Sequence, residues 1–116
     1  MSNGYTLDHR VLDLRAITGF EWDRGNLEKN RAKHQVSMRE GEELFLNGPE
    51  VLEDTRHSER ERRWLAFGHT DDGRLLACAF TVRGVRLRVI SIRPMSRRER
   101  KWYAERSSVR ETSAGR

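Results

Sequence analysis

Apolar and polar positions alternate along the second half of the chain with the period of a β-strand, in segments separated by tight-turn sequences. Strands are predicted over residues 62–69, 74–83 and 86–93, with turns at Asp71-Asp72-Gly73 and Gly84-Val85. A short run over residues 50–54 predicts an additional edge strand, and the polar residues 55–61 predict a loop before the sheet. Consecutive strands joined by such short turns are expected to form an antiparallel meander.

Two helices are predicted before this sheet, each from a capping signal. After the extended residues 20–22, Asp23 can cap a helix that reaches about His34, because its carboxylate can accept from exposed backbone N–H groups. Residues 37–40 form a capping box, in which a serine and a glutamate each satisfy a backbone donor at a helix start. This second helix is expected to end by Asn47, since a glycine and a proline follow it.

A second capping box over residues 96–99 predicts a final helix that ends after Arg106. The expected fold is therefore α+β, an antiparallel sheet of about four strands with two N-terminal helices and one C-terminal helix. A single domain is predicted over residues 20–106, with a C-terminal tail over residues 107–116. Residues 1–19 carry scattered apolar positions that fit either an extension or an early helix.

Arginines interrupt the predicted sheet in a pattern that places several of them on one face. If Gly84 and Val85 are the central residues of the hairpin, the pairs across it are Arg83 with Arg86, Thr81 with Arg88, and Ala79 with Ile90. The opposite face is continuously apolar, and Arg93 falls outside the pattern. Two interpretations fit: a phosphate-binding cleft floored by Thr81 and walled by the three arginines, or a sheet edge kept soluble by charge.

The charge distribution along the 116 residues favours a polyanionic partner. The chain has 23 Lys and Arg against 18 Asp and Glu, a net charge of +5. Residues 40–54 contain six acids and no base, whereas residues 83–106 contain nine bases and two acids. This segregation favours a surface that is positive on one side.

Several other features limit the compartment and the chemistry. Cys78 is the only cysteine and lies in an apolar run, which predicts a buried residue in a reducing compartment. No apolar segment approaches the roughly 20 residues needed to cross a bilayer and no signal-peptide pattern occurs, so a cytoplasmic protein is expected. The four histidines lack metal-ligand spacing, and no nucleotide-binding glycine motif is present, so neither a metal nor a cofactor is expected.

The segment from His57 to Arg63 contains the residue types that metal-free RNA cleavage requires. A base removes the 2′-OH proton, cations stabilise the charged phosphorane, and an acid protonates the leaving 5′-oxygen. His57, Glu61 and the arginines could supply these roles, although a solvated polar loop has the same composition. In the final helix, Trp102 is expected in the core and the Tyr103 hydroxyl at the rim of the site.

The ordered series of motifs resembles the BrnT family of type II toxin–antitoxin toxins. The series is FEWD, Asn-x-x-Lys-His-x-Val-Ser, HSERE, GRLL, TVRG, RLRVISIR and RRERKWY, and it spans residues 20–105. The resemblance implies a RelE-like ribonuclease fold and RNA cleavage that arrests translation and growth. It also implies neutralisation by a BrnA-type antitoxin with a ribbon-helix-helix domain, and repression of the operon by the complex through operator DNA.

The resemblance can be carried over residue by residue. The matching positions are Trp22, Asp23, Asn30, Lys33, His34, His57, Glu61, Arg63, Thr81, Arg83, Arg88, Ser91, Arg93, Glu99 and Tyr103. Departures occur at Gln35, where the family usually has glycine, at Met38, which replaces a common phenylalanine, and at Pro94-Met95.

These arguments lead to a specific set of expected site residues. The residues expected to be catalytic are His57, Glu61, Arg63, Arg83, Arg88 and Tyr103, with His57 and Glu61 as the acid–base pair. The residues expected to bind RNA are Lys33, His34, Arg86, Arg93 and Lys101, although Lys33 and His34 could equally stabilise the end of their helix. The competing hypotheses are a non-catalytic module that binds nucleic acid or a partner, and a degenerate toxin that retains only the antitoxin interface.

Overall fold

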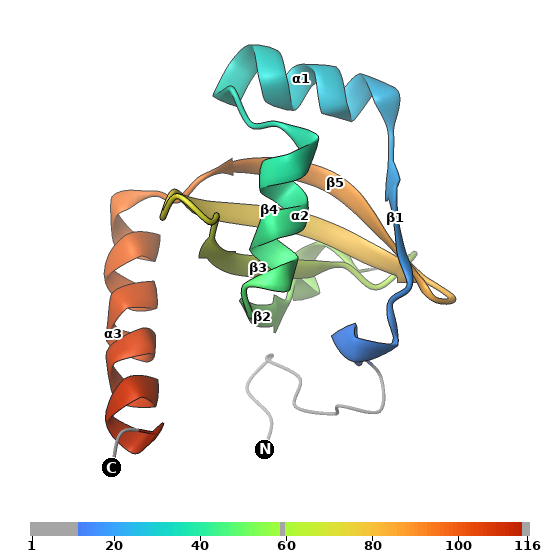
Figure 1. Ribbon diagram of the computed structural model, residues 1–116. Coiled ribbons are helices and arrows are strands. Elements are labelled where there is room, and N and C mark those ends of the chain that lie inside the picture. The colour runs from blue at the N-terminus through green and yellow to red at the C-terminus, as the bar shows by residue number, and fades with distance from the viewer. Residues whose placement is uncertain (1–11, 59, 115–116) are drawn as a thin grey trace.

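The computed structural model describes residues 12–58 and 60–114 and has a five-stranded sheet with three α-helices (Figure 1). The strands are β1 (Gly19–Trp22), β2 (Glu50–Glu53), β3 (Trp64–His69), β4 (Leu75–Arg83) and β5 (Arg86–Pro94), in the spatial order β1-β5-β4-β3-β2. The helices are α1 (Arg24–His34), α2 (Met38–Leu46) and α3 (Arg97–Ala114), with short 3-10 turns η1 (Leu14–Ala16) and η2 (Thr55–His57). Across the described residues, no helix combines the length and apolar character needed to cross a membrane.

The predicted α+β fold and the antiparallel meander of β2 to β5 are confirmed. The sheet nevertheless has a fifth strand, because β1 pairs with β5 in parallel, with Glu21 opposite Arg88. The prediction of an antiparallel sheet of about four strands was therefore incomplete, and the sheet is mixed. The sequence indicated that residues 20–22 are extended, but their partners on β5 are 67 positions further along the chain, so no local signal predicts the pairing.

The predicted helix starts are confirmed by their caps. The Asp23 carboxylate accepts a hydrogen bond from the backbone N–H of Asn26 at 3.0 Å, and both halves of the capping box between Ser37 and Glu40 are formed. Helix α3 extends to Ala114, so the predicted end at Arg106 was too early. No glycine or proline interrupts residues 97–114, and a helix that lacks a stop signal continues. The part of the N-terminal prediction that concerns residues 1–11 lies outside the described residues.

Gln35 ends helix α1 in the left-handed conformation, with φ 55° and ψ 42°. This is the position at which the BrnT pattern usually has glycine, the residue that adopts positive φ without steric cost. Arg74 supports the turn, because its guanidinium donates to the backbone oxygens of His34 at 2.7 Å and Gln35 at 2.8 Å. In this chain a glutamine therefore adopts the left-handed conformation, and Arg74 bonds to the backbone on either side of the helix end.

The two faces of the sheet are covered unequally. One face packs on α1 and α2 through a fully buried core that includes Leu44, Phe80 and Ile92. The other face is covered by α3 only at one end, where Trp102 meets Phe67 edge-on at 5.3 Å. Figure 1 shows α2 crossing the sheet and α3 standing beside it. The remainder of the second face is left for the polar side chains of β4 and β5.

A β-bulge in the β4–β5 hairpin changes the predicted register. The pairs Arg83 with Arg86 and Thr81 with Arg88 are confirmed, but Ala79 lies opposite Ser91 and not Ile90. The predicted pairing of Ala79 with Ile90 is therefore wrong, because Ile90 is an extra residue between Val89 and Ser91. The bulge shifts the alternation by one position, so that Arg93 returns to the face that carries Arg88.

This shift explains Arg93, which the regular alternation did not. Arg93 forms two hydrogen bonds to the Glu99 carboxylate, at 2.7 and 2.9 Å, and so ties the end of β5 to the first turn of α3. The bonds from Arg93, together with the backbone N–H of Ser96, lower the pKa of Glu99 to about 2. The contact with Glu99 thus explains why an arginine occupies this position at the end of β5.

We expect Glu99→Gln to reduce the free energy of unfolding near neutral pH by about 1 kcal/mol, a value discounted for the partial exposure of the pair. The folded pKa of about 2 lies below the ordinary value of 4.5, so the stabilisation is present above pH 4.5 and is lost as the pH falls towards 2. Urea unfolding over this pH range should show the parent and the variant converging in acid. Glu105→Gln, on the exposed side of the same helix, is the control, and parallel acid profiles for the parent and Glu99→Gln would contradict the assignment.

Candidate active site

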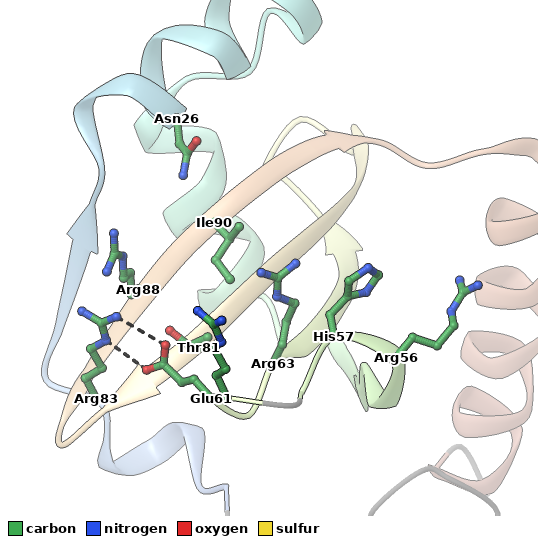
Figure 2. Close-up of a pocket in the computed structure, with 10 residues that line it drawn as sticks. Asn26, Arg56, His57, Glu61, Arg63, Thr81, Arg83, Arg88 and Ile90 are labelled. Carbon is green, nitrogen blue, oxygen red and sulfur yellow. Dashed lines mark hydrogen bonds and ion pairs between the residues drawn. The ribbon is translucent and has the colours of Figure 1, made fainter.

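A pocket of about 490 Å³ lies on the part of the second sheet face that α3 leaves uncovered (Figure 2). It is lined by residues from α1, from η2 and the loop after it, and from β4 and β5. These residues are Asn26, Arg56, His57, Arg60, Glu61, Arg63, Thr81, Arg83, Arg88 and Ile90. Five of the ten are arginines, so the pocket is suited to an anionic ligand.

Arg83 and Glu61 form a two-point contact in the pocket. The guanidinium of Arg83, at the end of β4, donates to both carboxylate oxygens of Glu61, at 3.0 and 3.3 Å (Figure 2). These hydrogen bonds, followed by the charges of Arg83, Arg88 and Arg63, lower the pKa of Glu61. Glu61 is therefore held in its anionic form, which is an acceptor only.

Arg88 is placed in the pocket by both of its neighbouring strands. It lies opposite Thr81 on β4 and opposite Glu21 on β1. One guanidinium nitrogen is 3.6 Å from a carboxylate oxygen of Asp23, the residue that also caps helix α1. Asp23 therefore has a second role that the sequence did not indicate, because its other oxygen faces an arginine of the pocket.

His57 has a carboxylate partner that the sequence analysis missed. Its Nδ1 lies 3.0 Å from a carboxylate oxygen of Asp54, whose side chain is largely buried. This contact orients the ring and leaves Nε2 available to the pocket. The signal was the spacing of three residues between Asp54 and His57, which a 3-10 turn brings onto one side.

Ser58 fixes the loop that carries these groups. Its hydroxyl donates to the backbone oxygen of Asp54 at 2.7 Å and accepts from the backbone N–H of Arg63 at 3.0 Å. The backbone N–H of Asp54 in turn donates to the backbone oxygen of Arg63 at 2.8 Å. The two ends of the loop are thereby closed, so that His57 and Arg63 are presented to the same pocket (Figure 2).

Five of the six residues predicted to be catalytic line this pocket, namely His57, Glu61, Arg63, Arg83 and Arg88. Tyr103 lies elsewhere. Its hydroxyl is 3.1 Å from Nδ1 of His69, and its ring packs on the smaller core cluster under α3. The prediction that Tyr103 stands at the rim of the site therefore does not fit its position, since the apolar end of the sheet draws both aromatic residues of α3 inward.

The residues predicted to bind RNA lie outside the pocket lining. Lys33 and His34 are at the end of α1, and Lys101 is exposed on α3. Arg86 lies opposite Arg83 at the hairpin turn and is exposed, while Arg93 is bound to Glu99.

Arg56 and Arg60, which do line the pocket, were not singled out as site residues, although both belong to the arginine-rich segment before β3. Among the side chains that the structure describes, no three of His, Cys, Asp or Glu gather closely enough to hold a metal ion.

Comparison with known proteins identifies the family of this chain. The family described as "Ribonuclease toxin, BrnT, of type II toxin-antitoxin system" matches residues 22–99, a range that contains every residue of the pocket. The chain belongs to the BrnT family.

A solved BrnT structure has a similar fold. The crystal structure of the Brucella abortus ribonuclease toxin, BrnT, is 27% identical in sequence and superimposes with a TM-score of 0.54. The match covers 69% of this chain and 99% of the Brucella BrnT chain. No curated protein matches the sequence significantly. The BrnT assignment therefore rests on the family match and on this shared fold.

In this BrnT-family toxin, we expect Arg83→Met to raise the pKa of Glu61 towards its ordinary value of 4.5, because the hydrogen bonds from Arg83 are the largest cause of the lowered pKa. A pH titration of the glutamate carboxyl carbons by ¹³C NMR measures the change directly. Arg97→Met, which removes an exposed arginine from α3, should leave the Glu61 titration unchanged. A Glu61 titration that is the same in Arg83→Met and the parent would show that the contact does not persist in solution.

Proposed function

We propose that this BrnT-family toxin is an RNA endonuclease that cleaves without a metal ion, in the arginine-lined pocket. The observation that supports this most directly is the convergence of a carboxylate, an oriented histidine and five arginines on one pocket of about 490 Å³. Guanidinium groups can supply the positive charge at the phosphorane that a metal supplies in other nucleases. The roles of the individual residues follow from their contacts.

Glu61 is the proposed base and His57 the proposed acid. The anionic Glu61 carboxylate accepts the proton of the 2′-OH, the 2′-oxygen attacks phosphorus, and the P–O5′ bond breaks as His57 protonates the leaving oxygen. The products are a 2′,3′-cyclic phosphate and a 5′-hydroxyl end. Figure 2 shows Arg63 between Glu61 and His57, an arrangement that suits in-line displacement with base and acid on opposite sides of the phosphate.

Substrate binding would also free the base. In the protein alone, Arg83 is occupied by Glu61. A phosphate can replace the exposed Glu61 carboxylate at the guanidinium fork, because it also presents two anionic oxygens, and its charge grows as the phosphorane forms. When the phosphate takes Arg83, Glu61 loses the contact that lowers its pKa, and it becomes a stronger base next to the 2′-OH.

Incubating the purified protein with bulk RNA in EDTA tests this function. Cleavage that yields 5′-hydroxyl ends is expected, and Glu61→Gln should slow it by about 10²- to 10⁴-fold. Arg83→Ala should slow it by roughly 10²- to 10³-fold, because a charge that stabilises the transition state is lost. Arg97→Ala is the matched control, an exposed arginine outside the pocket. Salt-sensitive binding without cleavage would instead identify a binding module, and unchanged cleavage by both variants would refute these roles.

We further propose that RNA cleavage inhibits translation and growth in the cytoplasm, and that a BrnA-type antitoxin with a ribbon-helix-helix domain neutralises the toxin. The support is the membership of the chain in a family of type II toxin–antitoxin toxins, which implies a protein antitoxin. In this proposal the toxin reaches operator DNA only through the antitoxin, and the complex represses its own operon.

Expression in a bacterial host separates these possibilities. The parent chain should arrest growth, Arg83→Ala should not, and co-expression with the neighbouring gene should restore growth. A degenerate toxin would bind the neighbouring gene product without arresting growth when expressed alone. Growth arrest by Arg83→Ala equal to that of the parent would show that toxicity does not depend on the pocket.

A further inference from the structure

Thr81 places a hydroxyl without a hydrogen-bond partner at the floor of the pocket. Only 3% of the residue is exposed, and among the described residues no donor or acceptor contacts its Oγ1. Most buried side-chain polar atoms have a partner, because leaving one unsatisfied is costly. Thr81 also lines the pocket, so its buried hydroxyl, which has no partner among the described residues, is suited to contact a ligand bound there.

The surroundings of Thr81 indicate which kind of ligand atom it meets. It lies directly opposite Arg88 across the hairpin and two residues before Arg83, and all three side chains are on the same face (Figure 2). An anion held by these two guanidinium groups lies over the floor of the pocket. The hydroxyl can donate to such an anion, and a hydrogen bond to a charged acceptor is stronger than one to a neutral acceptor.

We infer that the Thr81 hydroxyl donates a hydrogen bond to a non-bridging oxygen of the RNA phosphate that Arg83 and Arg88 hold. This inference rests on the proposed function of the same pocket and adds a neutral phosphate ligand to its arginines. Because threonine is uncharged, its contribution to binding does not release counterions. The contribution of Thr81 therefore differs from that of the arginines in its dependence on salt.

The test compares Thr81→Val, which keeps the shape of the side chain and removes the hydroxyl, with Thr81→Ser, which keeps the hydroxyl. The probe is a mixed-sequence oligonucleotide with 2′-fluoro groups, which lacks the attacking 2′-OH and is not cleaved. Thr81→Val should weaken binding about 10- to 100-fold, the range for a hydrogen bond to a charged group, and Thr81→Ser should restore most of the affinity. The slope of log affinity against log salt should stay that of the parent, whereas Arg88→Ala should reduce it by about 1.

Thermal unfolding separates a ligand contact from a structural one. Thr81→Val should unfold at the same temperature as the parent or higher, because it removes an unsatisfied group. Thr70→Val is the control: this threonine is 1% exposed, and its Oγ1 accepts from the backbone N–H of Arg74 at 3.0 Å. Thr70→Val should lower the unfolding temperature and leave affinity for the probe unchanged.

The outcomes distinguish this inference from the ribonuclease proposal. Equal affinity of Thr81→Val and the parent, or no binding of the probe by the parent, would overturn the inference. Loss of affinity accompanied by a fall in unfolding temperature like that of Thr70→Val would also overturn it, since the role would then be structural. A parent that binds the probe but cleaves no RNA, with binding weakened in Thr81→Val, would refute the ribonuclease proposal and support the phosphate contact.

Discussion

Repulsion among arginines is the constraint on which the pocket and its surroundings depend. Five arginines line one pocket, and like charges that gather in one place repel one another. Carboxylates at the edge of the pocket offset this repulsion: Glu61 binds Arg83, and Asp23 lies close to Arg88. Both acids belong to segments outside the β4–β5 hairpin, so these contacts also connect the start of α1 and the loop after η2 to the sheet.

The β-bulge is the second feature that shapes this face. Ile90, the extra residue, lines the pocket, and the residues after it are shifted, so that Arg93 reaches Glu99 and Ile92 enters the core. Asn30 of α1 supports the irregular strand, because its side-chain oxygen accepts from the backbone N–H of Ile92 at 3.3 Å in a buried position. Arg88, before the extra residue, thus lines the pocket, whereas Arg93, after it, contacts Glu99 of α3.

The pocket is more than a positive surface. Alongside the arginines it presents the apolar side chain of Ile90, the amide of Asn26 and the buried hydroxyl of Thr81. A surface that is merely kept soluble by charge requires none of these groups, whereas a nucleotide has a phosphate, a sugar hydroxyl and an apolar base face to contact. In the protein alone, the Glu61 carboxylate occupies the arginine fork that a phosphate would take. The pocket therefore combines a cluster of positive charges with an internal anion that balances part of them.

Local signals in the sequence determined most of the elements of this protein. Capping boxes, turn residues and strand alternation are properties of neighbouring residues, and they correctly predicted α1, α2, the start of α3 and the meander of β2 to β5. Only the tertiary structure decided the parallel partner of β1 and the bulge at Ile90, because both depend on backbone pairing between separate segments. The contact of His57 with Asp54 is compatible with their spacing of three residues, but it required a 3-10 turn where a loop was predicted. Tyr103 shows the same limit of prediction from sequence. Its helix was predictable, but its hydroxyl contacts His69 because the apolar end of the sheet lies under that turn of α3. The residue types of the site could thus be found in the sequence, whereas their convergence followed from which part of the sheet the helices leave uncovered.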